Sequence, residues 1–381
     1  MKYTTISADS HIDMTWLPGD LFTSNVSSQW KEAVPKVVET KEGFRWVAEG
    51  KELGVVGGMG HGFGAPKRGL SLRTDKMIDV GFYKDGSLGK PHPTTPELRL
   101  KDMEMDQIDA EVIYGILATG LRLDNKDLVT IVYQVYNNWI SEFCNSYPGR
   151  WAGLACIPNH DPEQAAKEVY RASALGLKGA DFDVVTASKD LWDMDWEPLW
   201  HALEECKMPV SFHVTGPRGY PLREDLANDS REGLIFIGIR LTLFQSCAAE
   251  FLASIILSGA LDRHPGLNFV LGEAGAGWLP YTLERMDLEY EDRLQGLNLS
   301  MKPSEFWYRQ GYTTFQTETT GPKTLDMIGY DNVMWGSDYP HPDGVWPGSQ
   351  DAISNDMGHL SEDVRDKLIR GNAARLYGFS T

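Results

Sequence analysis

The sequence predicts an α/β fold, a (β/α)8 TIM-type barrel that carries an insertion after its first strand. Short apolar runs typical of strands alternate with helical patterns from about residue 110 to the end of the chain. Together with a first strand at residues 2–8, this alternation gives about eight β/α units. A doubly wound sheet is the rival architecture, but no glycine-rich phosphate turn follows the first strand.

The expected strands are apolar runs of four to eight residues bounded by turn residues. They lie at residues 2–8, 110–114, 151–157, 179–182, 209–213, 268–273, 313–317 and 333–336. Helical patterns connect them at residues 128–147, 162–176, 196–207, 245–263, 278–294 and 322–328. The second of these helices has a clear start signal, since Asp161 is a favourable N-cap and Pro162 suits the first helical position.

Residues 18–96 break the alternation within what we expect to be a single domain spanning residues 1–381. The segment is rich in glycine around residues 54–64 and carries scattered basic and aromatic side chains. We interpret it as an insertion, or lid, that caps the mouth of the barrel, with His61 as a candidate lid residue. The alternative is an excursion without a role.

Composition excludes several classes of function. The 381 residues carry a net charge of −18, which disfavours binding to nucleic acid or to an anionic membrane surface. The four cysteines form no CxxC pair, and the N-terminus shows no apolar leader, so we expect a cytoplasmic protein with reduced thiols. The longest apolar stretch, residues 243–261, is interrupted by polar residues and is expected to form a buried helix.

Candidate metal ligands stand at the carboxyl ends of three predicted strands. Asp9, His11 and Asp13 are spaced two apart, so a strand would project them to one face. His213 ends the fifth strand and Asp338 follows the eighth. The carboxyl ends of barrel strands form the active-site mouth. Imidazole and carboxylate ligands together suit Zn²⁺, Mn²⁺, Fe²⁺ or Co²⁺.

Two further histidines receive different interpretations. His341 lies three residues after Asp338 and is a candidate for reaching the mouth. His264 precedes the sixth strand, at the opposite end of the barrel, and is expected to be structural.

The motifs DSHID, FHVTG, HPGLNFVLGEAGAGWLPYTLERMD and WGSDYPHP, in this order, resemble the amidohydrolase superfamily in its amidohydrolase-related branch. That branch includes aminocarboxymuconate semialdehyde decarboxylase, γ-resorcylate decarboxylase and assorted hydrolases. The resemblance implies a (β/α)8 barrel that holds a divalent metal through Asp9, His11, His213 and Asp338. It also implies a small-molecule substrate and a homo-oligomer, a dimer or larger.

The chain departs from the superfamily pattern at two strands. The fourth strand lacks the lysine that bridges two metals in some members, because Lys178 stands at its wrong end, although Asp183 could supply a carboxylate. At the sixth strand the decarboxylases of the branch place a histidine, whereas this chain has Glu273. A carboxylate there could act as a general base or as a further metal ligand.

We therefore expect a metal-dependent hydrolase that uses a metal-activated water on a small carboxylated, phenolic or lactone-like substrate. Asp338, Glu273 and His213 form the expected catalytic set, and Glu273 and Asp13 are additional candidate ligands. The alternative is a metal-dependent non-oxidative decarboxylase of an aromatic or unsaturated acid. A dinuclear, di-iron-type oxygenase and a catalytically inactive scaffold are further alternatives.

Overall fold

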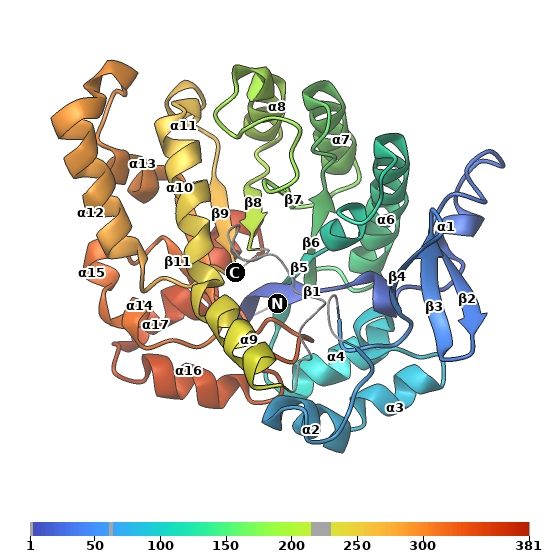
Figure 1. Cartoon of the computed structure of the whole chain (residues 1–381). Helices are drawn as coiled ribbons and strands as arrows, with labels where there is room; N and C mark the ends of the chain where they lie inside the picture. The colour runs from blue at the N-terminus through green and yellow to red at the C-terminus, as the bar shows by residue number, and fades with distance from the viewer. Residues whose placement is uncertain (1–2, 61–63, 215–229, 381) are drawn as a thin grey trace.

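The computed structural model describes residues 3–60, 64–214 and 230–380, so His61 lies outside the described residues. Eight parallel strands follow one another around a barrel in the order β1-β5-β6-β7-β8-β9-β10-β11, with helices on the outside (Figure 1). The strands are β1 (Ile6–His11), β5 (Ala110–Tyr114), β6 (Trp151–Cys156), β7 (Gly179–Asp181), β8 (Val210–His213), β9 (Phe269–Gly272), β10 (Gly311–Phe315) and β11 (Val333–Trp335). The predicted fold class is confirmed.

The barrel closes where the segment after β11 meets β1. Ser10 and Tyr339 form a parallel bridge, and the Asp338 backbone N–H donates to the Asp9 carbonyl at 2.9 Å. Gly336 permits this approach, because a Cβ at that position would lie 2.4 Å from the Cβ of Asp9. The carboxyl ends of the first and last strands are thereby brought side by side.

The outer helices bury their apolar faces against the strands, as the amphipathic patterns predict. Asp161 caps α7 (Pro162–Ala174) by accepting hydrogen bonds from the N–H groups of Glu163 and Gln164, which confirms the predicted helix start. The helices after β5 are α5 (Leu117–Gly120), α6 (Lys126–Ser146), α7 (Pro162–Ala174), α8 (Glu197–Cys206), α9 (Arg231–Leu243), α10 (Ala248–Leu257), α11 (Ala260–Arg263), α12 (Leu279–Glu289), α13 (Pro303–Gln310), α14 (Thr320–Lys323), α15 (Leu325–Ile328), α16 (Ser349–Met357), α17 (Glu362–Asp366) and α18 (Asn372–Tyr377).

Several predicted boundaries are wrong. The first strand continues through His11, because β5 on one side and the Tyr339 segment on the other pair with its polar end. The helix expected at residues 245–263 divides into α10 and α11 at Gly259, whose φ of 73° ends a right-handed helix. The helix expected at residues 322–328 is likewise two short helices, α14 and α15.

The segment between β1 and β5 has a structure that the sequence did not predict. An antiparallel sheet of β2 (Lys36–Thr40), β3 (Gly43–Ala48) and β4 (Lys51–Val55) lies beside the barrel in Figure 1. The short helix α1 (Leu21–Ser24) precedes this sheet, and α2 (Leu72–Asp79), α3 (Phe82–Ser87) and α4 (Pro96–Met105) follow it. A buried ion pair fixes α4 to the barrel, with Arg99 Nε 2.7 Å from Glu111 Oε2 on β5.

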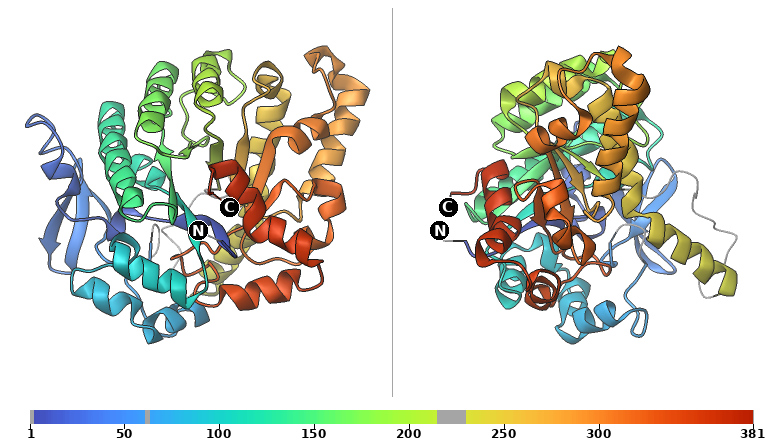
Figure 2. Two further views of the ribbon diagram at one scale, coloured as in Figure 1. Left: turned by 180° about the vertical axis from the view of Figure 1, so that it is seen from behind. Right: turned by 90° about the vertical axis from the view of Figure 1, so that its left-hand side faces the viewer.

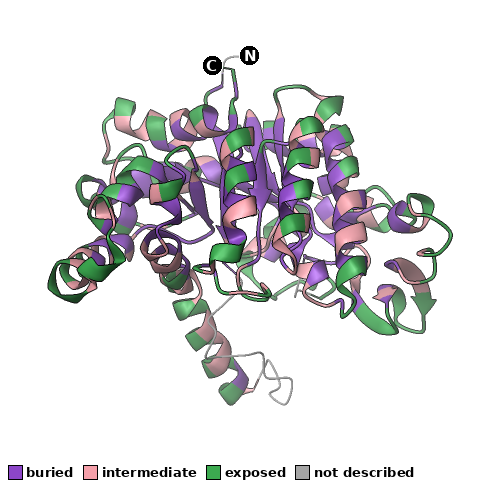
Figure 3. Ribbon diagram, turned by 90° about the horizontal axis from the view of Figure 1, so that it is seen from above, coloured by how far each residue is buried: buried purple, intermediate pink, exposed green. Residues whose placement is uncertain are grey.

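The chain ends and α9 mark opposite ends of the molecule. The two termini lie together on one side, and α9 projects from the other side (Figures 2 and 3). Within the described residues no single helix is long and apolar enough to cross a membrane, although the bent pair α9 and α10 reaches the threshold of length and composition.

Candidate metal centre at the barrel mouth

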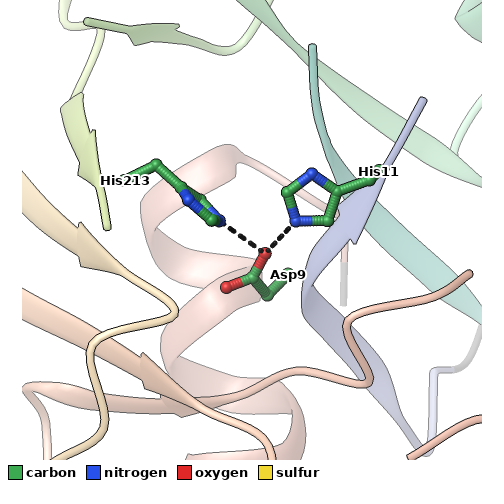
Figure 4. A group of neighbouring side chains, drawn as sticks. All are labelled: Asp9, His11 and His213. Carbon is green, nitrogen blue, oxygen red and sulfur yellow. Dashed lines mark ion pairs between the residues drawn. The ribbon is translucent and has the colours of Figure 1, made fainter. Parts of the chain in front are cut away.

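The centre of the site is built by β1. Asp9 and His11 are two residues apart on this strand and point to the same side, with His11 Nε2 3.2 Å from Asp9 Oδ1. His213, at the end of β8, directs Nε2 to within 3.7 Å of the same oxygen (Figure 4). Three side chains from two strands that are far apart in the sequence thus converge on one point.

Asp338 completes this group from the turn after β11. Its Oδ1 lies 3.1 Å from His11 Nε2. Its backbone has a φ of 54°, a left-handed conformation that is uncommon for a residue with a side chain and is often found at functional sites. Asp9, His11 and His213 form one cluster, and Asp338 adjoins it through His11, so all four predicted metal ligands lie at the barrel mouth.

The atoms that face one another in this group suit a cation. Asp9 Oδ1, His11 Nε2, His213 Nε2 and Asp338 Oδ2 are buried, and none makes a hydrogen bond of good geometry with the described residues, although His11 Nε2 lies 3.2 Å from Asp9 Oδ1 and 3.1 Å from Asp338 Oδ1. Buried polar atoms are normally hydrogen-bonded, so four such atoms in one place require an explanation. Two imidazole nitrogens and two carboxylate oxygens are a donor set that a divalent transition-metal ion accepts.

Neighbouring groups fix the orientation of two of these side chains. The second oxygen of Asp9, Oδ2, accepts from the Thr314 hydroxyl at 2.7 Å and from the Glu273 backbone N–H at 2.9 Å, which leaves Oδ1 facing the histidines. His213 Nδ1 lies 3.0 Å from the Val214 carbonyl, which requires Nδ1 to carry a proton and turns Nε2 toward the site. Thr314 has no sequence signal, because it is one of two adjacent threonines within β10.

The charges of the site influence one another strongly. Burial raises the pKa of Asp9, but the attraction of the nearby His11 and His213 rings outweighs burial and holds that pKa well below its usual range. Burial lowers the pKa of His213, yet Asp9 and Glu273 raise it overall to about 10. A positive charge is thus strongly favoured between these carboxylates, whether it is carried by protons or by a metal ion.

Glu273 borders the four-residue group on the side of His213. It follows β9 with a φ of 53°, and its Oε2 lies 3.7 Å from His213 Nε2. Burial, reinforced by the negative charge of Asp338, raises the pKa of Glu273 well above its usual value. Glu273 also forms a carboxylate cluster with Asp338 and Asp343, whose potential ligand atoms lie within 4.8 Å of one another.

His341 reaches the mouth and engages two carboxylates. Its Nδ1 is 3.0 Å from Asp338 Oδ1, and its Nε2 is 3.1 Å from Asp13 Oδ2. Asp13, an additional candidate ligand, is therefore linked to the four-residue group through His341. Asp343 was not identified from the sequence, although its position five residues after Asp338 was an available signal.

The fourth barrel strand contributes differently from the expectation. Asp183 accepts hydrogen bonds from Asn159 and from the backbone of its own turn, so it stabilises a loop. Asp181, at the end of β7, is buried, and burial raises its pKa to about 7 although His213 and His11 oppose the shift. At the other end of the barrel, His264 contacts Glu197 and Glu204, as a structural residue would.

Comparison with known proteins places this chain in a family. A family model described as Amidohydrolase matches residues 78–379. The chain belongs to the amidohydrolase family. The resemblance inferred from the sequence motifs is thereby confirmed.

Relatives of this amidohydrolase include enzymes of known activity. A γ-resorcylate decarboxylase from Rhodococcus jostii is 26% identical over 74% of this chain and 87% of its own length. An amidohydrolase structure from Mycobacterium avium subsp. paratuberculosis has 18% identity and a TM-score of 0.75, covering 99% of this chain and 100% of that one. A dihydroxybenzoic acid decarboxylase from Polaromonas, solved with bound manganese and the inhibitor 2-nitroresorcinol, has 22% identity and a TM-score of 0.61 over 81% of this chain and 94% of that one.

Proposed function

We propose that this amidohydrolase is a metal-dependent, non-oxidative decarboxylase of a small aromatic acid. The observation that carries the proposal is the similarity to γ-resorcylate decarboxylase over 74% of the chain. It favours the decarboxylase alternative over the hydrolase that the sequence analysis placed first. The orphaned donor atoms at the barrel mouth support a metal-dependent reaction of this kind.

Asp9, His11, His213 and Asp338 would hold one divalent ion, and the manganese of the Polaromonas enzyme makes Mn²⁺ the first ion to test. When bound, the ion would supply positive charge that polarises an oxygen of the substrate. Thr314 and the Val214 carbonyl hold the donor atoms of Asp9 and His213 in place.

Decarboxylation breaks the bond between a ring carbon and its carboxylate, releases CO₂ and leaves the bonding electron pair on the ring. A proton must then reach that carbon, so the site needs an acid beside the substrate. Glu273 is the group we assign to this step, because its carboxyl borders the donor group, with Oε2 3.7 Å from His213 Nε2. The Glu273 backbone N–H, bonded to Asp9 Oδ2, fixes its position relative to the site.

The insertion at residues 18–96 would act as the cap of this site within the single domain. Gly60 supports this role, because its backbone packs directly against the ring of His341. A Cβ at this position would lie only 2.9 Å from Cδ2 of His341. The insertion therefore reaches the residues at the mouth. A cap of this kind excludes water from the reacting carbon.

Hydrolysis is the second candidate, favoured by the same Glu273, since a carboxylate beside the donor group can accept a proton from water. The dinuclear oxygenase would need a second ion, for which Glu273, Asp338 and Asp343 form one candidate cluster and His11, Asp338 and His341 form another. The amount of bound metal and the reaction products distinguish the decarboxylase, the hydrolase and the oxygenase.

The test combines elemental analysis of protein purified without chelators with product assays. One equivalent of metal and CO₂ release from 2,6-dihydroxybenzoate or another hydroxybenzoate would support the decarboxylase. Hydrolysis of esters or lactones without CO₂ release would overturn it, and two equivalents of iron would indicate the oxygenase. Glu273→Gln should abolish CO₂ release and retain the metal, whereas loss of about half the metal would make Glu273 a ligand of a second ion.

A further inference from the structure

Helix α9 stands out from the body of the molecule on the side away from the termini (Figures 2 and 3). Most of its 13 residues are leucine, isoleucine or phenylalanine, yet the only buried residue of the helix is Gly233. Leu234 and Leu241 are 60% and 63% exposed. A helix that is apolar all round is normally enclosed. The described part of a single chain therefore leaves α9 without its cover.

The most exposed face of α9 is centred on Gly238. Leu234 and Ile235 lie one turn before this glycine, and Leu241 and Thr242 lie one turn after it, so these five residues share one face. All five are exposed, and a Cβ on Gly238 would extend into open space. Side chains on the opposite side of the helix are half-buried. The face that points away from the body is thus apolar, with an open glycine at its centre.

A membrane does not fit α9 as its cover. A membrane-spanning helix needs about 20 apolar residues, and α9 has 13. The following helix, α10, cannot extend it, because Phe251, Leu252 and Ile256 are buried in the core of the molecule. Helices that lie on a membrane surface oppose a basic face to their apolar one. By contrast, α9 is apolar on several sides and belongs to a chain of net charge −18, which anionic lipids repel.

A second copy of this chain fits the face electrostatically. The helix carries two arginines and one acidic residue, Glu232, which lies six positions before Gly238 and therefore off the outward face. Two chains of net charge −18 repel one another over most of their surfaces. They can approach with least repulsion where a face is apolar and has no acidic side chain.

The spacing about Gly238 also suits pairing with an identical helix. Apolar side chains stand three and four residues before the glycine, and Leu241 stands three residues after it. When two α9 helices cross antiparallel at Gly238, Leu234 of each copy meets the turn of Leu241 and Thr242 in the other. A two-fold interface requires this kind of self-complementarity. The glycine at the crossing point lets the two backbones approach closely, so that the flanking side chains interlock.

We propose that α9 is a self-association surface, through which two copies of this chain pair about a two-fold axis at Gly238. The two helices, each about 20 Å long, bury less surface than a standard interface of about 1,600 Å². The dimer therefore dissociates at micromolar concentrations. This inference goes beyond the proposed function and stands whether or not the reaction is a decarboxylation.

Sedimentation velocity of the full chain between about 1 and 100 μM measures the association. We expect the wild type to shift from monomer to dimer as its concentration rises. The double variant Leu234→Glu, Leu241→Glu brings like charges together across the axis and should weaken association at least about 100-fold. The matched control is Leu72→Glu, Leu88→Glu, which adds the same charge at two exposed leucines outside α9 and should associate like the wild type.

A cysteine on the predicted axis tests the geometry directly. Gly238→Cys places a thiol opposite its own copy, so mild oxidation should give a disulfide-linked dimer. Leu72→Cys, at an exposed position away from α9, is the matched control. The wild type gives the background from the four native cysteines.

Three results would overturn the proposal: a wild type that stays monomeric throughout, a dimer that persists unchanged in Leu234→Glu, Leu241→Glu, or no more cross-linking of Gly238→Cys than of Leu72→Cys. A monomeric wild type that sediments with phosphatidylcholine vesicles, and loses this binding in Leu234→Glu, Leu241→Glu, would overturn it in favour of a membrane. Thermal unfolding of each variant checks that the fold is intact.

Discussion

Thr314→Val provides a sharp test of how the metal-binding group is held in place. The Thr314 hydroxyl donates to Asp9 Oδ2 at 2.7 Å and also accepts from the Glu273 backbone N–H at 2.7 Å. Valine has nearly the same shape but removes both contacts. Asp9 Oδ2 then keeps one donor, the Glu273 N–H at 2.9 Å.

The expected loss can be estimated from the hydrogen bond to a charged acceptor, worth about 1.5–3 kcal/mol. Removing an outer partner of a metal ligand lowers metal affinity roughly 10- to 100-fold, which corresponds to about 1.4–2.8 kcal/mol. The two free-energy ranges overlap. Both losses have the same cause, since without the Thr314 hydroxyl the Asp9 carboxylate is held less firmly. We therefore expect Thr314→Val to weaken Mn²⁺ binding by one to two orders of magnitude.

Chelator competition, with the free Mn²⁺ concentration fixed by the chelator, measures this affinity directly. Thr313→Val is the matched control, since Thr313 is equally buried on β10 but its hydroxyl donates to the Gly275 carbonyl at 2.8 Å and does not contact Asp9. Both variants should lose stability, and only Thr314→Val should lose metal affinity. Equal affinities for the two variants would refute the reasoning.

Three other predictions concern the site and its supports. His213→Ala should lose bound metal and activity while thermal unfolding stays cooperative; metal at wild-type stoichiometry would contradict its assignment as a ligand. Burial lowers the pKa of His92, but Asp102 and a second carboxylate outweigh burial and raise it above its ordinary value. Its contribution to stability should therefore be complete below about pH 6.5 and be lost as the pH rises through the higher folded-state pKa. Urea unfolding of His92→Gln and wild type across this range checks the sign, and a stability difference that grows with pH would contradict it. Arg99→Met should cost about 3–5 kcal/mol, because it leaves Glu111 as an uncompensated buried charge; a loss below about 1 kcal/mol in urea unfolding would show that the pair is dispensable.

Much of the barrel could be predicted from the sequence because its signals are local. Strand β5 has the predicted bounds, and β6 to β9 and β11 differ from them by a residue or less at either end. The sequence also predicted that Asp9, His11, His213 and Asp338 lie near one another, because a barrel places the carboxyl ends of all its strands at one mouth. The antiparallel sheet of the insertion was missed, since its three strands are short and their alternation of apolar and polar residues is weak.

The sequence by itself determined the architecture and which residue types meet at the mouth, because periodicity and strand-end position are properties of short segments. Tertiary structure decided which atoms face one another. Thr314 orients Asp9 across 305 positions of sequence. Such contacts depend on how distant segments pack together, and no local pattern encodes that packing.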